Sequence, residues 1–224
     1  GSDVPNYSTV FGNTITQLAE NEDKIICVTA AMEIGTGMYP FTEKYPNRFV
    51  DVGIAEEHAI TYSAGLAAAG FKPVIPIYST FMQRAYDHIF HDALLQKLPL
   101  IYCMDRAGVV GADGPTHHGV FDLSFMSTLP GMIVSAPKDG NELRDLMATA
   151  LNSKKNFSIR YPKDTSRKYN EKKSAEILQI GSWEILHKGI ESAILAVGSM
   201  VGMILDAKQD LYSELGYIPT IINA

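Results

Sequence analysis

The chain has 224 residues, of which 46% are hydrophobic and 20% are charged, and its formal net charge is -6 at pH 7. This composition is typical of a globular protein, and the length allows one substantial domain plus part of a second. The negative charge and the lack of a basic stripe interleaved with aromatics argue against nucleic acid as a partner. No apolar run approaches the ~20 residues that a membrane span needs.

Short apolar runs alternate along the first three quarters of the chain with segments of helical period. We expect strands at Lys24–Thr29, Arg48–Val52, Pro73–Tyr78, Leu100–Met104, Met132–Ser135 and Phe157–Tyr161. We expect helices at Glu56–Ala69, Phe81–Lys97 and Asp139–Leu151. Nearly continuous apolar strands that alternate with helices are typical of a parallel sheet covered on both faces. The sequence therefore predicts an α/β domain over residues 1–164.

The composition changes after this domain. Residues 165–190 are charged and poor in apolar side chains, which indicates an exposed linker. A second apolar run ends at Gly198 and leads into an expected helix near Met200–Leu215. Because about 35 residues cannot bury a core of their own, we expect residues 191–224 to be the truncated start of a second α/β domain.

The two cysteines, Cys27 and Cys103, both lie inside apolar runs. This position indicates buried, reduced thiols and predicts a cytoplasmic protein. His88 and His91 are spaced to share one helix face, but no third ligand follows at a recognisable spacing, so we expect no metal site in this chain. The sequence also lacks the glycine-rich fingerprints of Rossmann and P-loop proteins.

Three polar clusters follow predicted strands, and ligands gather at the carboxyl ends of parallel strands. The first opens a helix with Glu56 and Glu57, and the second contains Tyr78, Phe81 and Arg84. On spacing alone, an acidic helix start and core aromatics explain these two better than a ligand site does. The third cluster is the glycine-rich segment "GVVGADGPTHHGVFD", which follows the run "LPLIYCMDRA".

Taken together, the segments resemble one family. "RFVDVGIAEEHAITYSAGLAAAG", "IYSTFMQRAYDH" and "DRAGVVGADGPTHHGVFDLS" are similar, in this order, to the pyrimidine-binding domain of the 1-deoxy-D-xylulose-5-phosphate synthases. These are thiamine-diphosphate enzymes of the transketolase superfamily. The resemblance runs from about Tyr7 to Pro162 and continues into the opening of the family's C-terminal domain. The third segment separates this family from transketolases and from oxo-acid dehydrogenase β subunits.

The resemblance implies roles for the first two clusters. Glu56, the first acid of "AEEH", matches the catalytic carboxyl group that binds the aminopyrimidine of thiamine diphosphate and drives it to its imino tautomer. A desolvated site would favour the protonated form that this step needs. Phe81 matches the aromatic that stacks on the pyrimidine, with Tyr78 beside it. Glu57 stands where the family does not use an acid for this role.

The resemblance also implies a substrate site for pyruvate and glyceraldehyde 3-phosphate. Arg106 and Arg160 match phosphate-binding arginines, whose planar forks suit phosphate oxygens. Asp113 and His117 match loop residues that contact substrate and assist proton transfer, which makes His117 a catalytic candidate. Arg84 is implied as a further cation on the substrate side.

The implied reaction is a transferase step of isoprene and thiamine biosynthesis. Pyruvate is decarboxylated, and its two-carbon unit is joined to glyceraldehyde 3-phosphate to form 1-deoxy-D-xylulose 5-phosphate, in a homodimeric enzyme. The family's N-terminal domain, whose G-D-G…N motif binds Mg²⁺ and the diphosphate, has no counterpart in this sequence. We therefore expect the Mg²⁺ ligands to lie in that domain and the chain alone to be inactive.

Two alternatives remain open at this point. The C-terminal subunit of a split transketolase would use a ketose phosphate as donor instead of pyruvate. A non-catalytic module of the same fold would be expected to lack Glu56 or the aromatic pair, and both are present.

Overall fold

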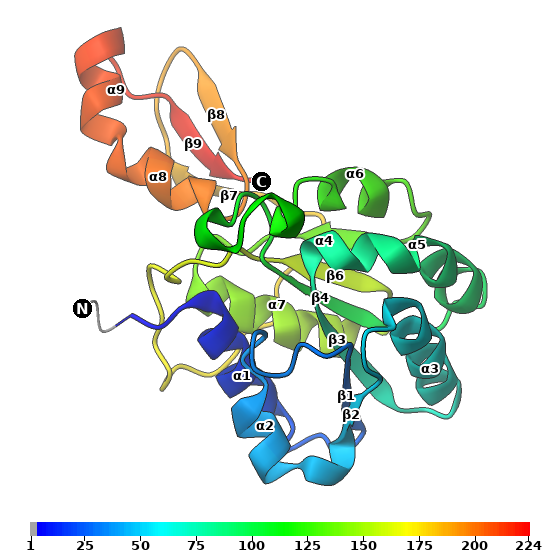
Figure 1. Ribbon diagram of the computed structural model, residues 1–224. Coiled ribbons are helices and arrows are strands. Elements are labelled where there is room, and N and C mark those ends of the chain that lie inside the picture. The colour runs from blue at the N-terminus through cyan, green and yellow to red at the C-terminus, as the bar shows by residue number, and fades with distance from the viewer. Residues whose placement is uncertain (1–3) are drawn as a thin grey trace.

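A computed structural model describes residues 4–224 (Figure 1). Its main sheet has six parallel strands in the order β2-β1-β3-β4-β6-β5. The strands are β1 (Ile25–Thr29), β2 (Phe49–Asp51), β3 (Lys72–Tyr78), β4 (Ile101–Asp105), β5 (Ile133–Ser135) and β6 (Phe157–Arg160). Each strand begins and ends within two residues of the ends of an expected strand, so the predicted parallel α/β sheet is confirmed.

Helices cover both faces of this sheet (Figure 1). One face carries α1 (Tyr7–Leu18), α2 (Tyr39–Lys44) and α7 (Gly140–Ser153), and the other carries α3 (Glu56–Ala68), segment 79–94 and α6 (Asp122–Ser127). Successive strand side chains point to opposite faces. Cys103 therefore belongs to the core under α1, α2 and α7, which we call the first core, and Tyr102 to the second core, under α3 and segment 79–94. Both faces are therefore buried, which explains the continuous apolar runs of the strands.

Helices α1, α2 and α6 were not among the expected elements. Helix α1 buries Tyr7, Val10, Phe11 and Ile15, and its first turn is capped by Asn6, whose Oδ1 accepts a hydrogen bond from the backbone N–H of Thr9 at 2.8 Å. This helix packs against α7 and closes the first core, so a missed element completes the domain.

The expected helix at Phe81–Lys97 is broken into shorter pieces. It consists of α4 (Ser79–Met82), a 3-10 turn, α5 (Tyr86–His88) and a π-helical turn at Ile89–Leu94. Ala85, Ile89 and Ala93 recur every four residues and are all buried. Because an α-helix repeats every 3.6 residues, wider π turns keep such a stripe on the sheet.

The chain order places a reversal in the sheet. From β1 the chain moves outward to β2 and then returns to the other side of β1 with β3. At such a switch point the loops that follow the two neighbouring strands diverge and leave a crevice at their carboxyl ends. In this domain the loop after β1, residues 30–38, contacts the junction of β3 with α4 at this edge, where the backbone N–H of Tyr78 donates to Sδ of Met32 at 3.3 Å.

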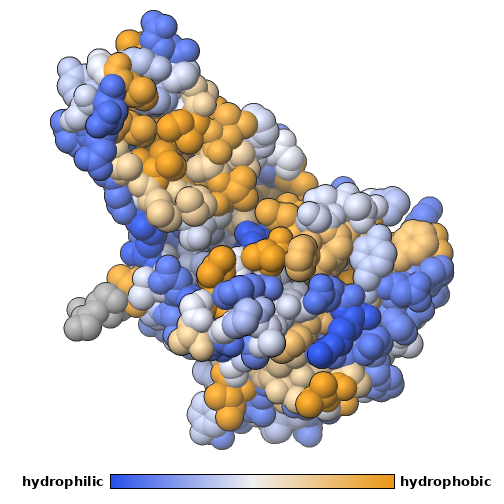
Figure 2. Space-filling model, turned by 45° about the horizontal axis from the view of Figure 1, so that its top comes forward, coloured by the Kyte–Doolittle hydropathy of each residue, from blue (hydrophilic) through white to orange (hydrophobic). Residues whose placement is uncertain are grey.

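A smaller sheet follows in the C-terminal part. It contains β7 (Glu184–His187), β9 (Thr220–Asn223) and β8 (Ala193–Ala196) in that order, with α8 (Met200–Asp206) and α9 (Lys208–Leu215) beside them. Figure 2 shows apolar surface over this unit, where Leu195, Met200 and Met203 are each about half exposed. Strand β7 lies inside the range expected as a linker, so we propose that the second unit begins near residue 184.

None of the helices within residues 4–224 combines the length and the apolar character needed to cross a membrane.

Helix α1 lies so close to the loop after β1 that only glycine fits at the contact. A Cβ on Gly12 would lie 1.8 Å from the carbonyl oxygen of Gly37. We expect Gly12→Ala to lower the free energy of unfolding by about 1–3 kcal/mol, although alanine favours a helix, because the backbone must move. Urea unfolding measures this change.

Gly65→Ala on α3 is the matched control, because nothing lies within 4 Å of its added Cβ. There the gain in helix propensity is expected to raise stability by up to about 1 kcal/mol. Equal effects at the two positions would contradict the close approach of α1.

Candidate active site

The three polar clusters meet at the carboxyl edge of the main sheet. Glu56 follows β2, Tyr78 ends β3, and Arg106 follows β4. The segment from Gly108 to Asp122 crosses above them and returns, because the backbone groups of Gly108 and Gly119 are hydrogen-bonded to each other in both directions at 2.8 Å. Parallel strands thus bring Glu56 and Arg106, which are 50 residues apart in the sequence, to one edge.

Glu56 is a buried carboxylate in the first turn of α3, with 1% of its surface exposed. Its Oε1 accepts a hydrogen bond from Nη1 of Arg84 at 2.8 Å. Arg84 was expected on the substrate side, and the structure places its guanidinium on Glu56, with 47% of the arginine side chain exposed. Glu57 is only partly buried, so the two adjacent acids have different surroundings.

Aromatic rings form a row beside this pair. The guanidinium of Arg84 lies 4.9 Å from the ring centroid of Phe81, and Phe81 stacks on Tyr78 with centroids 5.9 Å apart. His117, from the glycine-rich loop, meets Phe81 edge-on at 5.3 Å and Tyr78 at 6.2 Å. The structure therefore brings four of the expected site residues together, and the three residues with rings are each partly exposed.

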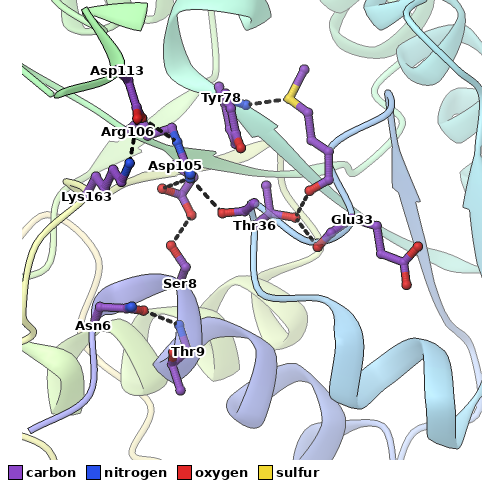
Figure 3. Close-up of polar contacts among 12 residues, drawn as sticks. Asn6, Ser8, Thr9, Glu33, Thr36, Tyr78, Asp105, Arg106, Asp113 and Lys163 are labelled. Atoms are coloured by element: carbon purple, nitrogen blue, oxygen red, sulfur yellow. Dashed lines mark hydrogen bonds and ion pairs between the residues drawn. The ribbon is translucent and has the colours of Figure 1, made fainter.

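Arg106 continues the row on the other side of Tyr78. Its guanidinium carbon lies 3.9 Å from the Tyr78 centroid, which is a cation–π contact. Nη1 donates to the carbonyl oxygen of Gly35 at 2.6 Å and to Oδ1 of Asp105 at 3.2 Å, while Nε donates to Oδ2 of Asp113 at 3.2 Å (Figure 3). Only 8% of Arg106 is exposed.

The backbone of Arg106 is unusual, because its φ of +59° lies in the left-handed region. A residue other than glycine in this region costs on the order of 1–3 kcal/mol unless its surroundings stabilise it. The four contacts of the guanidinium supply that stabilisation. The kink aims the side chain across the end of β3 instead of along the direction of β4.

Asp113 bridges the loop to the domain. One carboxylate oxygen accepts from Arg106, and the other accepts from Nζ of Lys163 at 2.5 Å. The Lys163 ammonium and the Arg106 guanidinium hold the pKa of Asp113 below its usual range. Asp113 was expected to contact substrate, and in the structure its carboxylate contacts these two cations.

Arg160, the last residue of β6, lies on a second buried carboxylate. Its Nε donates to Oδ2 of Asp122 at 2.8 Å, and the same oxygen accepts from the hydroxyl of Ser79 at 3.0 Å. Asp122 is 1% exposed. Among the described residues Arg160 and Arg106 share no hydrogen-bond acceptor, so the two expected phosphate-binding arginines belong to separate polar groups.

Several residues of the site were not expected from the sequence. Gly35 admits no side chain, because a Cβ there would lie 1.7 Å from the Tyr78 hydroxyl, and Gly119 would clash with Ser79. Asp105 and Asp122 lie behind the two arginines, and Lys163 contacts Asp113. An acid at the end of an apolar strand was a signal for Asp105. Nothing in the local pattern pointed to Gly35 or Lys163.

Two other histidines have structural contacts. His118 accepts a hydrogen bond at Nδ1 from the backbone N–H of Val110 at 3.2 Å, and His91 pairs with Asp87 at 2.9 Å. Within residues 4–224 no group of three or more His, Cys, Asp or Glu side chains is arranged to hold a metal ion.

Comparison with known proteins identifies the fold and the family. The family model of the transketolase pyrimidine-binding domain matches residues 3–168. A split-gene transketolase described as an inactive beta4 tetramer superposes with a TM-score of 0.85 and 24% identity, over 98% of this chain and 71% of that one. The transketolase of Campylobacter jejuni superposes with a TM-score of 0.84 and 19% identity, over 99% of this chain and 35% of that one. These two likenesses show the fold.

Sequence relatives are more similar. The 1-deoxy-D-xylulose-5-phosphate synthase of Dictyoglomus thermophilum is 52% identical over 98% of this chain, and that of Aquifex aeolicus is 49% identical over 100%. The chain spans 35% of the length of each of these relatives. The match over residues 3–168 therefore shows that this chain belongs to the transketolase pyrimidine-binding domain family.

Proposed function

We propose that this chain is the pyrimidine-binding part of a thiamine-diphosphate-dependent 1-deoxy-D-xylulose-5-phosphate synthase. Such an enzyme decarboxylates pyruvate and joins the two-carbon unit to glyceraldehyde 3-phosphate. The observation that carries the proposal is the position of Glu56, a buried carboxylate at the start of a helix, whose partner Arg84 lies against Phe81 of the aromatic pair Tyr78 and Phe81. The similarity to synthases over nearly the whole chain supports the same reaction.

The residues at this edge fit an aminopyrimidine. Such a ring needs a carboxyl group in its plane and an aromatic surface against its face. Oε1 of Glu56 is occupied by Arg84, whereas Oε2 accepts no hydrogen bond from the described residues. Phe81 and Tyr78 are both partly exposed. When bound, thiamine diphosphate supplies the nucleophilic carbon of the reaction, and Glu56 would hold the proton at the ring nitrogen.

Two arginines, Arg106 and Arg160, would form the site for the phosphate of glyceraldehyde 3-phosphate, which we call the aldehyde site. Arg106 uses Nε and Nη1 for protein contacts, and its Nη2 has no acceptor among the described residues. Arg160 likewise binds Asp122 through Nε alone. Each arginine is thus held through some of its N–H donors and keeps others for a phosphate group. His117 meets the Phe81 ring edge-on, and there it would move a proton to or from the substrate.

The alternative hypothesis, that the chain is the C-terminal subunit of a split transketolase, is less well supported. The chain is 24% identical to the split-gene transketolase and about half identical to the synthases. A test with pyruvate and with a ketose phosphate as donors separates the two. The Mg²⁺ requirement, the homodimer, the cytoplasmic location and the inactivity of the chain alone stay predictions.

We expect Glu56→Ala, in the full-length enzyme that contains this chain, to slow exchange of the cofactor's C2 proton for deuterium by about 10²- to 10⁴-fold. The carboxyl group that drives the tautomer is then missing, while the exposed Arg84 loses only one contact. Proton NMR of quenched samples measures the rate. Glu57→Ala is the matched control. A larger decrease of the exchange rate in Glu57→Ala than in Glu56→Ala would reverse the assignment of the two acids.

Arg106→Ala is expected to lower kcat/KM for glyceraldehyde 3-phosphate by roughly 10- to 150-fold, the value of one charge-assisted hydrogen bond. Unphosphorylated glyceraldehyde should be nearly unaffected, because it has no phosphate to bind. Steady-state kinetics with both aldehydes measures the difference.

Arg48→Ala provides the control for Arg106→Ala. Arg48 also stacks on a tyrosine, at 3.8 Å from the Tyr45 ring, and donates to backbone carbonyls, but it precedes β2 at the other end of the sheet. Equal losses for both aldehydes in Arg106→Ala would mean that the arginine only supports the loop.

His117→Ala is expected to lower kcat for both aldehydes by about 10²- to 10⁴-fold, because a group that moves a proton is needed whether or not the substrate carries a phosphate. His118→Ala, which removes only the contact to Val110, should cause a smaller loss. Similar losses in the two variants would show that His117 acts through loop structure.

A further inference from the structure

Asp105 is a carboxylate in a place where apolar side chains are the rule. It ends β4, a central strand of the sheet, and none of its surface is exposed. Burial raises the pKa of this carboxyl to about 6, although contacts with Ser8 and Arg106 oppose the rise. A buried acid is destabilising unless its oxygens are hydrogen-bonded, so the contacts of Asp105 indicate what it is for.

The two oxygens of Asp105 face different elements. Oδ2 accepts from the Ser8 hydroxyl of α1 at 2.6 Å, and Oδ1 accepts from Nη1 of Arg106 at 3.2 Å. Figure 3 shows this path, which continues from Arg106 through Asp113 to Lys163. The hydrogen bond from Ser8 orients the Asp105 carboxylate, and the orientation of the carboxylate sets the position from which Oδ1 binds Arg106.

The other carboxylate on Arg106 is less firmly anchored. Asp113 lies in an exposed loop in which Gly108, Gly111 and Gly114 all have positive φ. Asp105, by contrast, belongs to the sheet and lies under the guanidinium. Of the two carboxylates that contact Arg106 in the described chain, only Asp105 keeps its place independently of the loop.

We propose that Asp105 is a positioning residue for the phosphate site, which holds the Arg106 guanidinium over Tyr78 with Nη2 turned toward the substrate. This inference rests on the proposed function, because it assigns Asp105 to the same aldehyde site. Asp105 touches no substrate and acts through Arg106 alone. Loss of the Asp105 carboxylate should therefore reduce the gain in kcat/KM that the substrate's phosphate provides, and leave kcat/KM for an unphosphorylated aldehyde unchanged.

The test compares phosphorylated with unphosphorylated aldehyde in the full-length enzyme. We define the phosphate preference as kcat/KM for glyceraldehyde 3-phosphate divided by kcat/KM for glyceraldehyde. Asp105→Asn keeps the shape of the side chain and should lower this preference roughly 5- to 50-fold, as expected when contacting residues act as a unit. In an Arg106→Ala background the same change should have an effect of less than about twofold.

Asp145→Asn is the matched control. Asp145 is also a buried aspartate paired with its neighbour in sequence, Arg144, at 3.1 Å, but it lies on α7. It should leave the phosphate preference unchanged. Calorimetric binding of glyceraldehyde 3-phosphate to the folded variants gives a second measurement that needs no turnover, and it should weaken in Asp105→Asn and not in Asp145→Asn.

The outcomes separate this inference from the proposed function. If Arg106→Ala lowers the phosphate preference and Asp105→Asn does not, Asp105 serves only to dock α1 through Ser8, and the inference is wrong. Ser8→Ala and Asp105→Asn would then lower the melting temperature alike without changing the preference. If the wild-type enzyme does not use these substrates, or Arg106→Ala leaves the preference unchanged, the proposed aldehyde site itself fails.

Discussion

The ion pair of Asp105 with Arg106 is the contact on which the candidate site depends. It lies at the end of a central strand, and through it four separate parts of the chain meet: helix α1, the loop after β1, the end of β3 and the glycine-rich loop. Because Arg106 has a left-handed backbone, its side chain lies across the sheet edge. Tyr78 is then covered on one side by a cation and stacks on Phe81 on the other.

Charge is balanced locally throughout the site. Arg84 is paired with Glu56, Arg160 with Asp122, and Lys163 with Asp113. Paired ions tolerate burial better than single ones, so the arrangement allows several charged groups to share a partly dry edge. It also orients each arginine through at least one of its N–H donors. An anionic ligand would therefore meet donors that are already oriented, which lowers the ordering cost of binding.

The same architecture supports many activities, so the fold by itself does not define the reaction. The switch point between β1 and β3 lies at this edge, where ligands gather in open α/β sheets, and the helix that begins at Glu56 explains why a carboxylate is buried there. What distinguishes this site is the close fit of Gly35 against the Tyr78 hydroxyl and of Gly119 against Ser79. These contacts bring the loops near enough for His117 to reach the aromatic row.

The sequence by itself determined the main strands, because each is a short apolar run buried on both faces, and the family motifs located Glu56, Phe81 and Arg106. Their roles stay predictions. Only the tertiary structure decided that Arg84 lies on Glu56 and that Asp105 and Gly35 lie on Arg106. It also decided the π-helical turn and the place of α1. Local patterns report periodicity and burial, whereas partners such as Ser8 and Asp105 are 97 residues apart and meet only because helix α1 packs against the sheet in which β4 ends.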